Sequence, residues 1–370
     1  MLFSPDMRPV LVVGPHRSGT SVTTRVISLL GPALCAEEDR MIKPDNPAGH
    51  WESMSLMTLN EELLAALGGT WYAPPELPIG WERSDDLAEL RQRAVEQFYR
   101  VHPASGWVWK DPRLCLLLPF WTTALEIDPV VVLTVRHPVE IARSMMARDR
   151  FEWTHVLAIW EHHVVSALRN MAGFAVGVVR YDDLLANPRR ETARLQSVLG
   201  GFGVDVSGAE VDAAADTVDE RYRHNGASGS EGLSPEQAKV FELELNLDPA
   251  HPAFALAQEP WLSKASDELL RAQRKIHQSE REIEGRTAWA LKLRDEIEER
   301  DSTIRSLQGE VEERTGWALK LNDEIRDRDA TIRQLQAEIE ERTRWALQLD
   351  EELHRCRDLI RDRTAAGAAG

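Results

Sequence analysis

The residues best suited to chemistry form one short loop, GPHRSGTS, from Gly14 to Ser21. A β-branched apolar run, Val10 to Val13, precedes it, and apolar residues at helical spacing follow it, namely Val22, Val26, Leu29 and Leu30. Backbone N–H groups at the N-terminus of a helix form a natural phosphate site. This stretch therefore predicts a strand, a loop and a helix that together bind a phosphorylated ligand.

The loop departs from the phosphate loop of ATP and GTP enzymes at one position. Gly14, Gly19 and Ser21 fit the pattern G-x-x-x-x-G-K-[ST], but Thr20 replaces the lysine. In those enzymes the lysine contacts the β- and γ-phosphates, and the final hydroxyl holds magnesium. Here a cation lies inside the loop instead, at Arg17, where a guanidinium can pair with a terminal oxyanion. A tight turn with a solvated arginine is the competing interpretation.

A second pair of residues follows Val130 to Val135, the strongest strand signal in the chain. Arg136 ends this strand, at the edge where doubly wound sheets bind ligands. Ser144 lies about two turns into the helix predicted from Pro138 to Ala147, so the two residues offer a second phosphate site. The strand does not end in an aspartate of the kind that holds magnesium, which disfavours a kinase.

These two motifs, GPHRSGTS and RHPVEIARS, resemble the sulfotransferase family that uses 3′-phosphoadenosine-5′-phosphosulfate (PAPS). Three further stretches resemble the bacterial P-loop branch of that family: NPAGHWES (Asn46 to Ser53), WKDPRL (Trp109 to Leu114) and RYDDLLANP (Arg180 to Pro188). The resemblance spans residues 8 to 225. It implies a sulfuryl transfer enzyme with PAPS as the donor substrate.

The resemblance also implies roles for individual residues. The 5′ side of the donor would be held by Arg17, Ser18, Gly19, Thr20 and Ser21. The 3′-phosphate would be held by Arg136 and Ser144, with Arg221 or Arg223 reaching it from a late loop. The acceptor implied by the branch is a hydroxyl of a carbohydrate or glycoconjugate.

Sulfuryl transfer needs a base for the acceptor hydroxyl and positive charge for the transferring group, but it needs no metal. Arg17 and Lys110 suit the second task. Relatives use a histidine or a glutamate as the base, and this chain offers Glu52, His50, Glu37, Glu38 and Asp111. We select Glu52, which follows a Gly-His-Trp turn. A helix-terminal acid at Glu52 and a helix cap at Asp111 are the structural alternatives.

The order of elements predicts an α/β domain over residues 1–260, with a parallel sheet in a three-layer arrangement. Strands are expected at 107–109 and 175–179, besides the two above, and helices at 53–67, 85–101 and 151–171. Residues 203–236 carry no clear pattern. The Pro-, Gly- and Trp-rich segment Gly68 to Trp81 predicts an ordered surface loop, and a substrate lid is one interpretation of it.

From about Trp261 the pattern changes to heptads. Every seventh residue from Ile283 to Ile360 is Ile, Val, Leu or Ala, and the d positions alternate between arginine and leucine up to Leu349. Trp289, Trp317 and Trp345 recur at 28-residue steps. This pattern predicts a left-handed coiled coil over 261–364, roughly 150 Å long, with a disordered tail at 365–370. We expect it to join the enzyme into a parallel dimer or trimer and to tether it to a glycan-assembly partner.

The composition restricts the classes of partner. The net charge of the 370-residue chain is −17, and residues up to 270 carry 24 basic and 38 acidic side chains, which disfavours a nucleic-acid surface. The three cysteines fit neither a disulfide framework nor a zinc site. Without a secretory signal or a membrane span, a cytoplasmic protein is expected. A non-catalytic scaffold with a degenerate head and an atypical P-loop kinase are the alternative functions.

Overall fold

The computed structural model describes residues 8–41, 49–103, 106–208, 210–219, 231–256 and 261–367. The chain divides into two compact units, Met1–Glu282 and Ile283–Gly370. The first unit is built on a five-stranded sheet with the order β2-β1-β3-β4-β5. Its strands are β1 (Val10–Val13), β2 (Val108–Lys110), β3 (Val130–Val135), β4 (Ala175–Arg180) and β5 (Ala250–His251). The first four run parallel, and β5 pairs antiparallel with β4.

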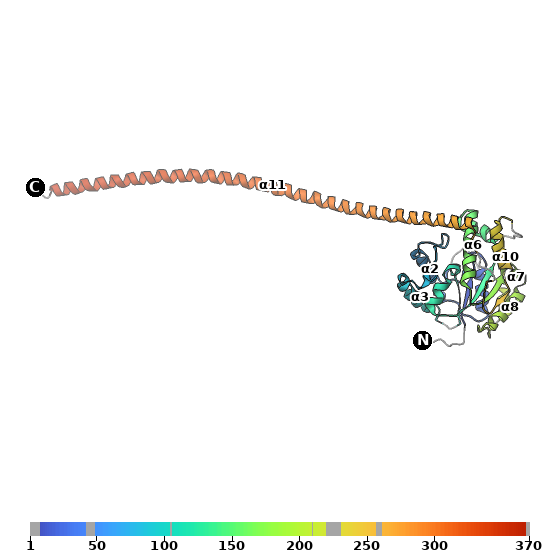
Figure 1. Ribbon diagram of the computed structural model, residues 1–370. Coiled ribbons are helices and arrows are strands. Elements are labelled where there is room, and N and C mark those ends of the chain that lie inside the picture. The colour runs from blue at the N-terminus through green and yellow to red at the C-terminus, as the bar shows by residue number, and fades with distance from the viewer. Residues whose placement is uncertain are drawn as a thin grey trace. The chain divides into compact units, whose positions relative to one another are not determined.

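Helices cover both faces of this sheet (Figure 1). The α-helices of the described residues are α1 (Thr20–Leu29), α2 (Met54–Ala66), α3 (Ala88–Val101), α4 (Leu114–Leu125), α5 (Pro138–Asp149), α6 (Trp153–Asn170), α7 (Tyr181–Ala186), α8 (Pro188–Gly201), α9 (Val211–Asp216), α10 (Pro235–Leu245) and α11 (Lys264–Gly367). Single 3₁₀ turns lie at Glu37–Asp39, Trp81–Arg83 and Asp85–Leu87.

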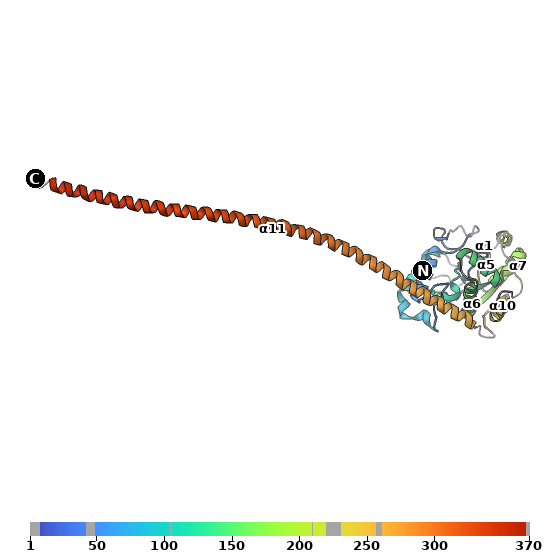
Figure 2. The same ribbon diagram turned by 90° about the horizontal axis from the view of Figure 1, so that it is seen from above.

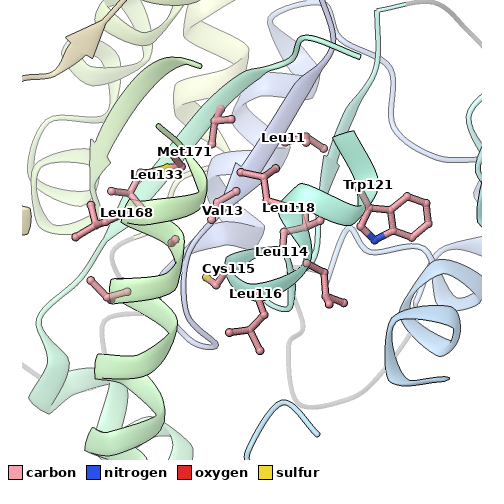
Figure 3. Packing of buried hydrophobic residues seen from close by; sticks show 14 of the residues in the cluster. Leu11, Val13, Leu114, Cys115, Leu116, Leu118, Trp121, Leu133, Leu168 and Met171 are labelled. Atoms are coloured by element: carbon pink, nitrogen blue, oxygen red, sulfur yellow. The ribbon is translucent and has the colours of Figure 1, made fainter. Parts of the chain in front are cut away.

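The alternation of side chains along β1 creates two cores. Leu11 and Val13 point into a larger cluster with α2 to α6, whereas Val10 and Val12 point into a smaller one with α1, α7 and α8. Figure 3 shows the larger cluster, in which Leu114, Cys115 and Leu118 of α4 lie against Leu11 and Val13. The predicted three-layer α/β architecture with a parallel sheet is confirmed.

The helices that follow the two central strands leave on opposite faces of the sheet. After β1 the chain enters α1, whose Ile27 is in the smaller cluster, and after the neighbouring β3 it enters α5, whose Ile141 is in the larger cluster. Such a reversal between adjacent parallel strands opens a crevice at their carboxyl ends, where α/β folds bind ligands. The fold therefore directs both predicted motifs to one crevice.

Most predicted elements have close counterparts, and the exceptions have physical reasons. The predicted stripe on α1 is partly wrong, because Val22 and Leu29 are only half-buried while Thr23, Thr24 and Ile27 are buried with Val26 and Leu30. α1 packs against β1, β2 and α9, and because threonine has the branched shape of valine, Thr23 and Thr24 can be buried in this packing. The two-residue β5 and the short α9 lie in segments too brief to show a period.

The root of α11 belongs to the first unit, which extends beyond the sequence boundary at 260–261 to Glu282. The fully buried carboxylate of Glu161, on α6, accepts hydrogen bonds from the backbone N–H of Ser263 at 2.6 Å and from the hydroxyls of Ser263 and Ser266 at 2.9 and 2.6 Å. Further along, Gln278 donates to the carbonyl of Gly68 at 2.9 Å. The root therefore holds the Gly68 to Trp81 loop.

The second unit is the remainder of α11, an uninterrupted helix in both views (Figures 1 and 2). Its side chains are exposed throughout the described part, including the apolar heptad residues such as Ile304, 51% exposed, and Trp317, 68% exposed. The helix extends to Gly367, into the tail predicted to be disordered. None of the helices in the described ranges combines the length and apolar character that a membrane span requires.

A buried histidine makes the stability of the first unit sensitive to acid. His102 stacks on Phe98 with ring centroids 4.6 Å apart, and burial lowers its pKa to about 3. Below pH 6.5 the unfolded chain takes up a proton at this residue while the folded chain does not, so the free energy of unfolding falls as the pH falls from 6.5 toward 3.

We expect His102→Phe to remove part of this acid sensitivity, worth up to about 2 kcal/mol at pH 5. The measurement is denaturant unfolding of both proteins at pH 7 and pH 5. The other buried histidines are common to both, so the difference between the two pH slopes isolates His102. Equal slopes would contradict the expectation.

Candidate functional site

A cavity of about 410 Å³ opens in the crevice at the carboxyl ends of β1, β2 and β3. The cavity is lined by residues of the Gly14 to Ser21 loop, of the segment before α2, of the strand ends and of α9. Its lining consists of His16, Arg17, Gly19, Thr20, Ser21, Val22, Arg25, Gly49, His50, Trp51, Glu52, Lys110, Pro112, Arg136, Arg148, Tyr181, Leu185, Asp216, Thr217 and Asp219. Five of these side chains are basic and three are acidic, so the cavity suits an anionic ligand.

Both glycines of the loop are required by close neighbours. A Cβ on Gly14 would lie 2.1 Å from Oγ1 of Thr134, on β3. The same Thr134 hydroxyl bonds the hydroxyl of Ser18 at 2.8 Å, so the Ser18 side chain faces the sheet rather than the cavity. Gly19 has φ +97°, and a Cβ there would lie 2.4 Å from the ring of Tyr181. The loop is thus pressed between the ends of β3 and β4.

Arg136 is held by three contacts. Its Nε donates to the fully buried carboxylate of Glu140, one helical turn later, at 3.0 Å. Its Nη1 donates to the backbone carbonyl of Arg17 at 2.9 Å, and its guanidinium lies over the ring of Tyr181, 4.5 Å from the centroid. Arg17 in turn donates from Nε to the Ser144 hydroxyl at 2.8 Å. The structure therefore joins the two sequence motifs into one network.

Lys110 supplies a positive charge next to the end of the loop. It comes from β2, is 2% exposed, and its Nζ donates to the Ser21 hydroxyl at 3.0 Å and pairs with the carboxylate of Glu52. Glu52 lies just before Ser53, whose side chain caps α2. Hence Glu52 does not serve as the helix cap. Glu52 lines the cavity beside the ammonium group of Lys110. Thr20, which replaces the lysine of the ATP and GTP enzymes, lines the same cavity.

The other candidate bases differ in whether they line the cavity. Asp111 is held by structural bonds, because its carboxylate accepts from Asn60 Nδ2 at 2.9 Å and from the backbone N–H of Arg113 at 2.8 Å. Glu37 and Glu38 are exposed on a 3₁₀ turn and do not line the cavity. His50 lines the cavity beside Glu52. His137 caps α5 by accepting from the Val139 N–H at 3.2 Å.

His16 also lines the cavity, although sequence reasoning did not select it. Its ring packs on Trp71 with centroids 4.2 Å apart. Burial lowers the pKa of His16 well below 6.5, and the neighbouring charges of Arg113 and Arg148 act in the same direction. The imidazole is therefore neutral at physiological pH.

Two cavity residues adopt the left-handed backbone conformation, Arg17 with φ 68° and Trp51 with φ 55°. Trp51 presents its ring to Arg25, whose guanidinium carbon lies 4.6 Å from the ring centroid. Such conformations are rare for large side chains and gather at functional sites. Sequence reasoning missed Trp51 and Arg25, since nothing in the local pattern marks a positive φ at a tryptophan.

Several other residues at or next to the cavity were missed for different reasons. Glu140 stands at i+4 from Arg136, a spacing that indicates an ion pair on a helix. Tyr181 follows a strand end, where side chains meet the crevice, whereas Asp216 and Thr217 lie in a segment without pattern. Arg221 and Arg223, expected near the 3′-phosphate, fall outside the described residues. Within the described ranges, no group of three or more His, Cys, Asp or Glu side chains is arranged to hold a metal ion.

Residues 9–201 match the model of a protein family described as the sulfotransferase family. The chain belongs to the sulfotransferase family. The matched range holds both arginine motifs, Lys110 and Glu52. No curated protein matches this sulfotransferase at a significant level.

Solved structures of bacterial sulfotransferases resemble it at low identity. The sulfotransferase domain from the curacin biosynthetic pathway is 12% identical, with a TM-score of 0.32 over 73% of this chain and 98% of that domain. The sulfotransferase domain of the Synechococcus PCC 7002 olefin synthase is 16% identical, with a TM-score of 0.32 over 73% and 97%. Sulfotransferase STF1 from Mycobacterium tuberculosis H37Rv is 18% identical, with a TM-score of 0.35 over 65% and 76%.

The buried pair of Lys110 and Glu52 makes a prediction about stability. Removing one partner leaves the other charge buried without compensation, which costs about 3–5 kcal/mol. We expect Lys110→Met to lower the free energy of unfolding by about that amount, and the double variant Lys110→Met with Glu52→Gln to recover much of the loss. Denaturant unfolding measures both. Additive losses in the double variant would show that the two side chains do not interact.

Proposed function

We propose that this sulfotransferase uses PAPS as its donor and sulfates a hydroxyl of a carbohydrate or glycoconjugate. The observation that carries the proposal is the network that joins Arg17, Arg136 and Ser144 at the carboxyl ends of adjacent strands. It offers one arginine from the loop and one from the second motif within a single cavity. A nucleotide with anionic groups on both its 5′ and 3′ sides matches this arrangement, and an NTP has no need of the second.

The donor is proposed to lie with its 5′-phosphosulfate against the loop. There Gly19 and Thr20 begin α1, so backbone N–H groups and the helix dipole favour the anion, and Ser18 contributes only to the shape of the loop. Ser21 and Lys110, which are hydrogen-bonded to each other, are proposed to contact the same 5′-phosphosulfate. The 3′-phosphate is proposed to lie near Arg136, with Ser144 acting through Arg17. Arg221 and Arg223 remain proposals for the same phosphate.

The transfer itself is proposed to proceed in line and without a metal. A bond forms between the acceptor oxygen and sulfur while the bond between sulfur and the 5′-phosphate oxygen breaks, which releases adenosine 3′,5′-bisphosphate. Glu52 accepts the hydroxyl proton, and Arg17 and Lys110 stabilise the charge on the leaving oxygen and the sulfuryl group. The ion pair with Lys110 supports this role, because it holds the Glu52 carboxylate in the cavity wall.

The competing proposals differ in measurable ways. An atypical kinase would bind ATP in a magnesium-dependent manner. A non-catalytic scaffold would bind nucleotide but transfer no sulfate to any acceptor, whereas transfer that is lost in Arg17→Ala excludes it. The family assignment favours the enzyme over both, and we place it in the cytoplasm, as the sequence predicts.

We expect Arg136→Ala to weaken binding of adenosine 3′,5′-bisphosphate at least about 30-fold, because it removes a charged contact and also removes the ion pair that compensates the buried Glu140. Titration calorimetry with the full chain, with and without EDTA, measures the affinity. Arg143→Ala, an exposed arginine on the same helix, serves as the matched control. Unchanged affinity in Arg136→Ala, or binding that requires magnesium, would reject the proposed donor.

The second unit is proposed to form a coiled coil with further copies of the same chain. A lone helix cannot bury the apolar heptad residues, whose exposed fractions along α11 range from 39% at Leu293 to 63% at Ile283. In a parallel pair in register, a d position lies beside the e position of the neighbouring helix. Arg300 and Arg328, at d, are each followed by an aspartate at e, namely Asp301 and Asp329, so this alignment neutralises two of the d arginines. The glycan-assembly partner stays a proposal about what the rod tethers.

We expect the full chain to sediment as an oligomer and the variant with Ile304→Asp and Ile332→Asp to sediment as a monomer of 41.8 kDa, because two carboxylates then face the a layers. Ser306→Asp with Gln334→Asp adds the same charge at c positions and should leave the mass of the oligomer unchanged. Equal masses for the two double variants would argue against the coiled coil.

A further inference from the structure

One nitrogen of His16 is placed to meet a ligand. The residue is 8% exposed and lines the cavity. Its Nε2 is completely buried and has no hydrogen-bond partner within the described part of the chain. Because Nε2 is buried in the protein, Nδ1 is the ring nitrogen that can face the cavity.

The protein interior next to His16 favours one tautomer. His163, on α6, has its ring centroid 6.3 Å from that of His16, and its Nδ1 lies 2.8 Å from the carbonyl oxygen of Ile159. A carbonyl only accepts, so this Nδ1 carries the proton of the neutral ring, and burial keeps that ring neutral by lowering its pKa to about 4. Nε2 of His163 is then a lone pair, buried and unpaired among the described residues. The nearby lone pair of His163 favours a proton on Nε2 of His16 over a second lone pair at that position. Nδ1 of His16 then carries no proton and acts as a hydrogen-bond acceptor.

The orientation of the His16 ring is also held from outside. Trp71 packs on it, and Trp71 itself contacts Tyr72 and Phe151 edge-on, with centroids 5.3 and 5.7 Å away. The Tyr72 hydroxyl lies 3.5 Å from Nδ1 of His277, in the root of α11. The loop between Gly68 and Trp81 therefore acts as a support for His16. A ring fixed in this way can select the direction of a hydrogen bond.

The position of His16 separates it from the proposed donor contacts. Its ring packs on Trp71, which belongs to the loop between Gly68 and Trp81. Arg136 lies against Tyr181, at the end of β4. In an in-line transfer the acceptor approaches opposite the leaving oxygen, on the side where the proposed base Glu52 takes its proton.

We propose that His16 binds the acceptor, with its Nδ1 accepting a hydrogen bond from a hydroxyl adjacent to the one that reacts. The proposal rests on the proposed function, because Glu52 is left to take the proton of the reacting hydroxyl. It defines the acceptor class more narrowly as a molecule with neighbouring hydroxyls, such as a pyranoside diol. A phenol with one hydroxyl does not make this contact. Trp71 and His163 are positioning residues for the ring.

The first test compares acceptor kinetics in the full chain, with labelled donor and a panel of methyl pyranosides plus 4-nitrophenol. We expect His16→Phe to raise KM for the pyranosides at least tenfold with a bisphosphate affinity within twofold of wild type. Glu52→Gln should lower kcat instead. His354→Phe, an exposed histidine of α11, is the matched control. An unchanged pyranoside KM in His16→Phe overturns the proposal, and loss of bisphosphate binding assigns His16 to the donor and also overturns it.

The positioning role of His163 has its own readout. His163→Leu should raise the pyranoside KM, and His163→Gln should restore it, because the amide oxygen can accept from Nε2 of His16. Equal KM values in the two variants would contradict the role assigned to His163.

The second test does not depend on turnover. Diethyl pyrocarbonate modifies neutral, accessible histidine nitrogens, and mass spectrometry of the peptide that contains His16 reports the extent. With adenosine 3′,5′-bisphosphate bound, we expect methyl glucopyranoside to slow modification of His16 at least threefold. Protection by the bisphosphate alone, or no added protection by the pyranoside, overturns the proposal. Failure of the bisphosphate to bind at all is a failure of the proposed donor and is seen separately by calorimetry.

Discussion

The ion pair between Arg136 and Glu140 is the constraint on which the cavity depends. Glu140 has no exposed surface, and the guanidinium one turn earlier compensates the charge of its buried carboxylate. The same guanidinium donates to the Arg17 carbonyl and lies over the ring of Tyr181. It therefore fixes the Gly14 to Ser21 loop relative to the end of β4. A single arginine at the end of β3 thus aligns elements from three parts of the chain.

Much of the fold could be predicted from the sequence because its signals are local. Val130 to Val135 is continuous and β-branched, and the leucine spacing of α2 shows its buried face, so both are recognisable without tertiary information. The face of α1 was harder to predict, since its core contacts include Thr23 and Thr24, which propensity treats as polar. The short β5 is a strand only because β4 lies beside it.

The residues of the candidate site likewise fall into those that local sequence signals predict and those that only the fold reveals. Arg17, Lys110, Arg136 and Glu52 were found because each belongs to a motif or ends a strand. Trp51, Arg148 and His16 were not, because their importance arises from what folds against them. His16 stands inside the best motif of the chain, yet only the structure reveals a buried Nε2 without a partner. A signal for Glu140 did exist, in its spacing from Arg136.

The backbone at two cavity residues has a further consequence. Four non-glycine residues have positive φ in the described chain; Glu126 and Arg150 end helices, a common place for that conformation, whereas Arg17 and Trp51 stand in the cavity wall. Each costs roughly 1–2 kcal/mol relative to an ordinary conformation. Folding meets that cost before any ligand arrives. The backbone conformation of Arg17 and Trp51 is therefore part of the fold itself, so a ligand proposed to bind there would not have to impose it.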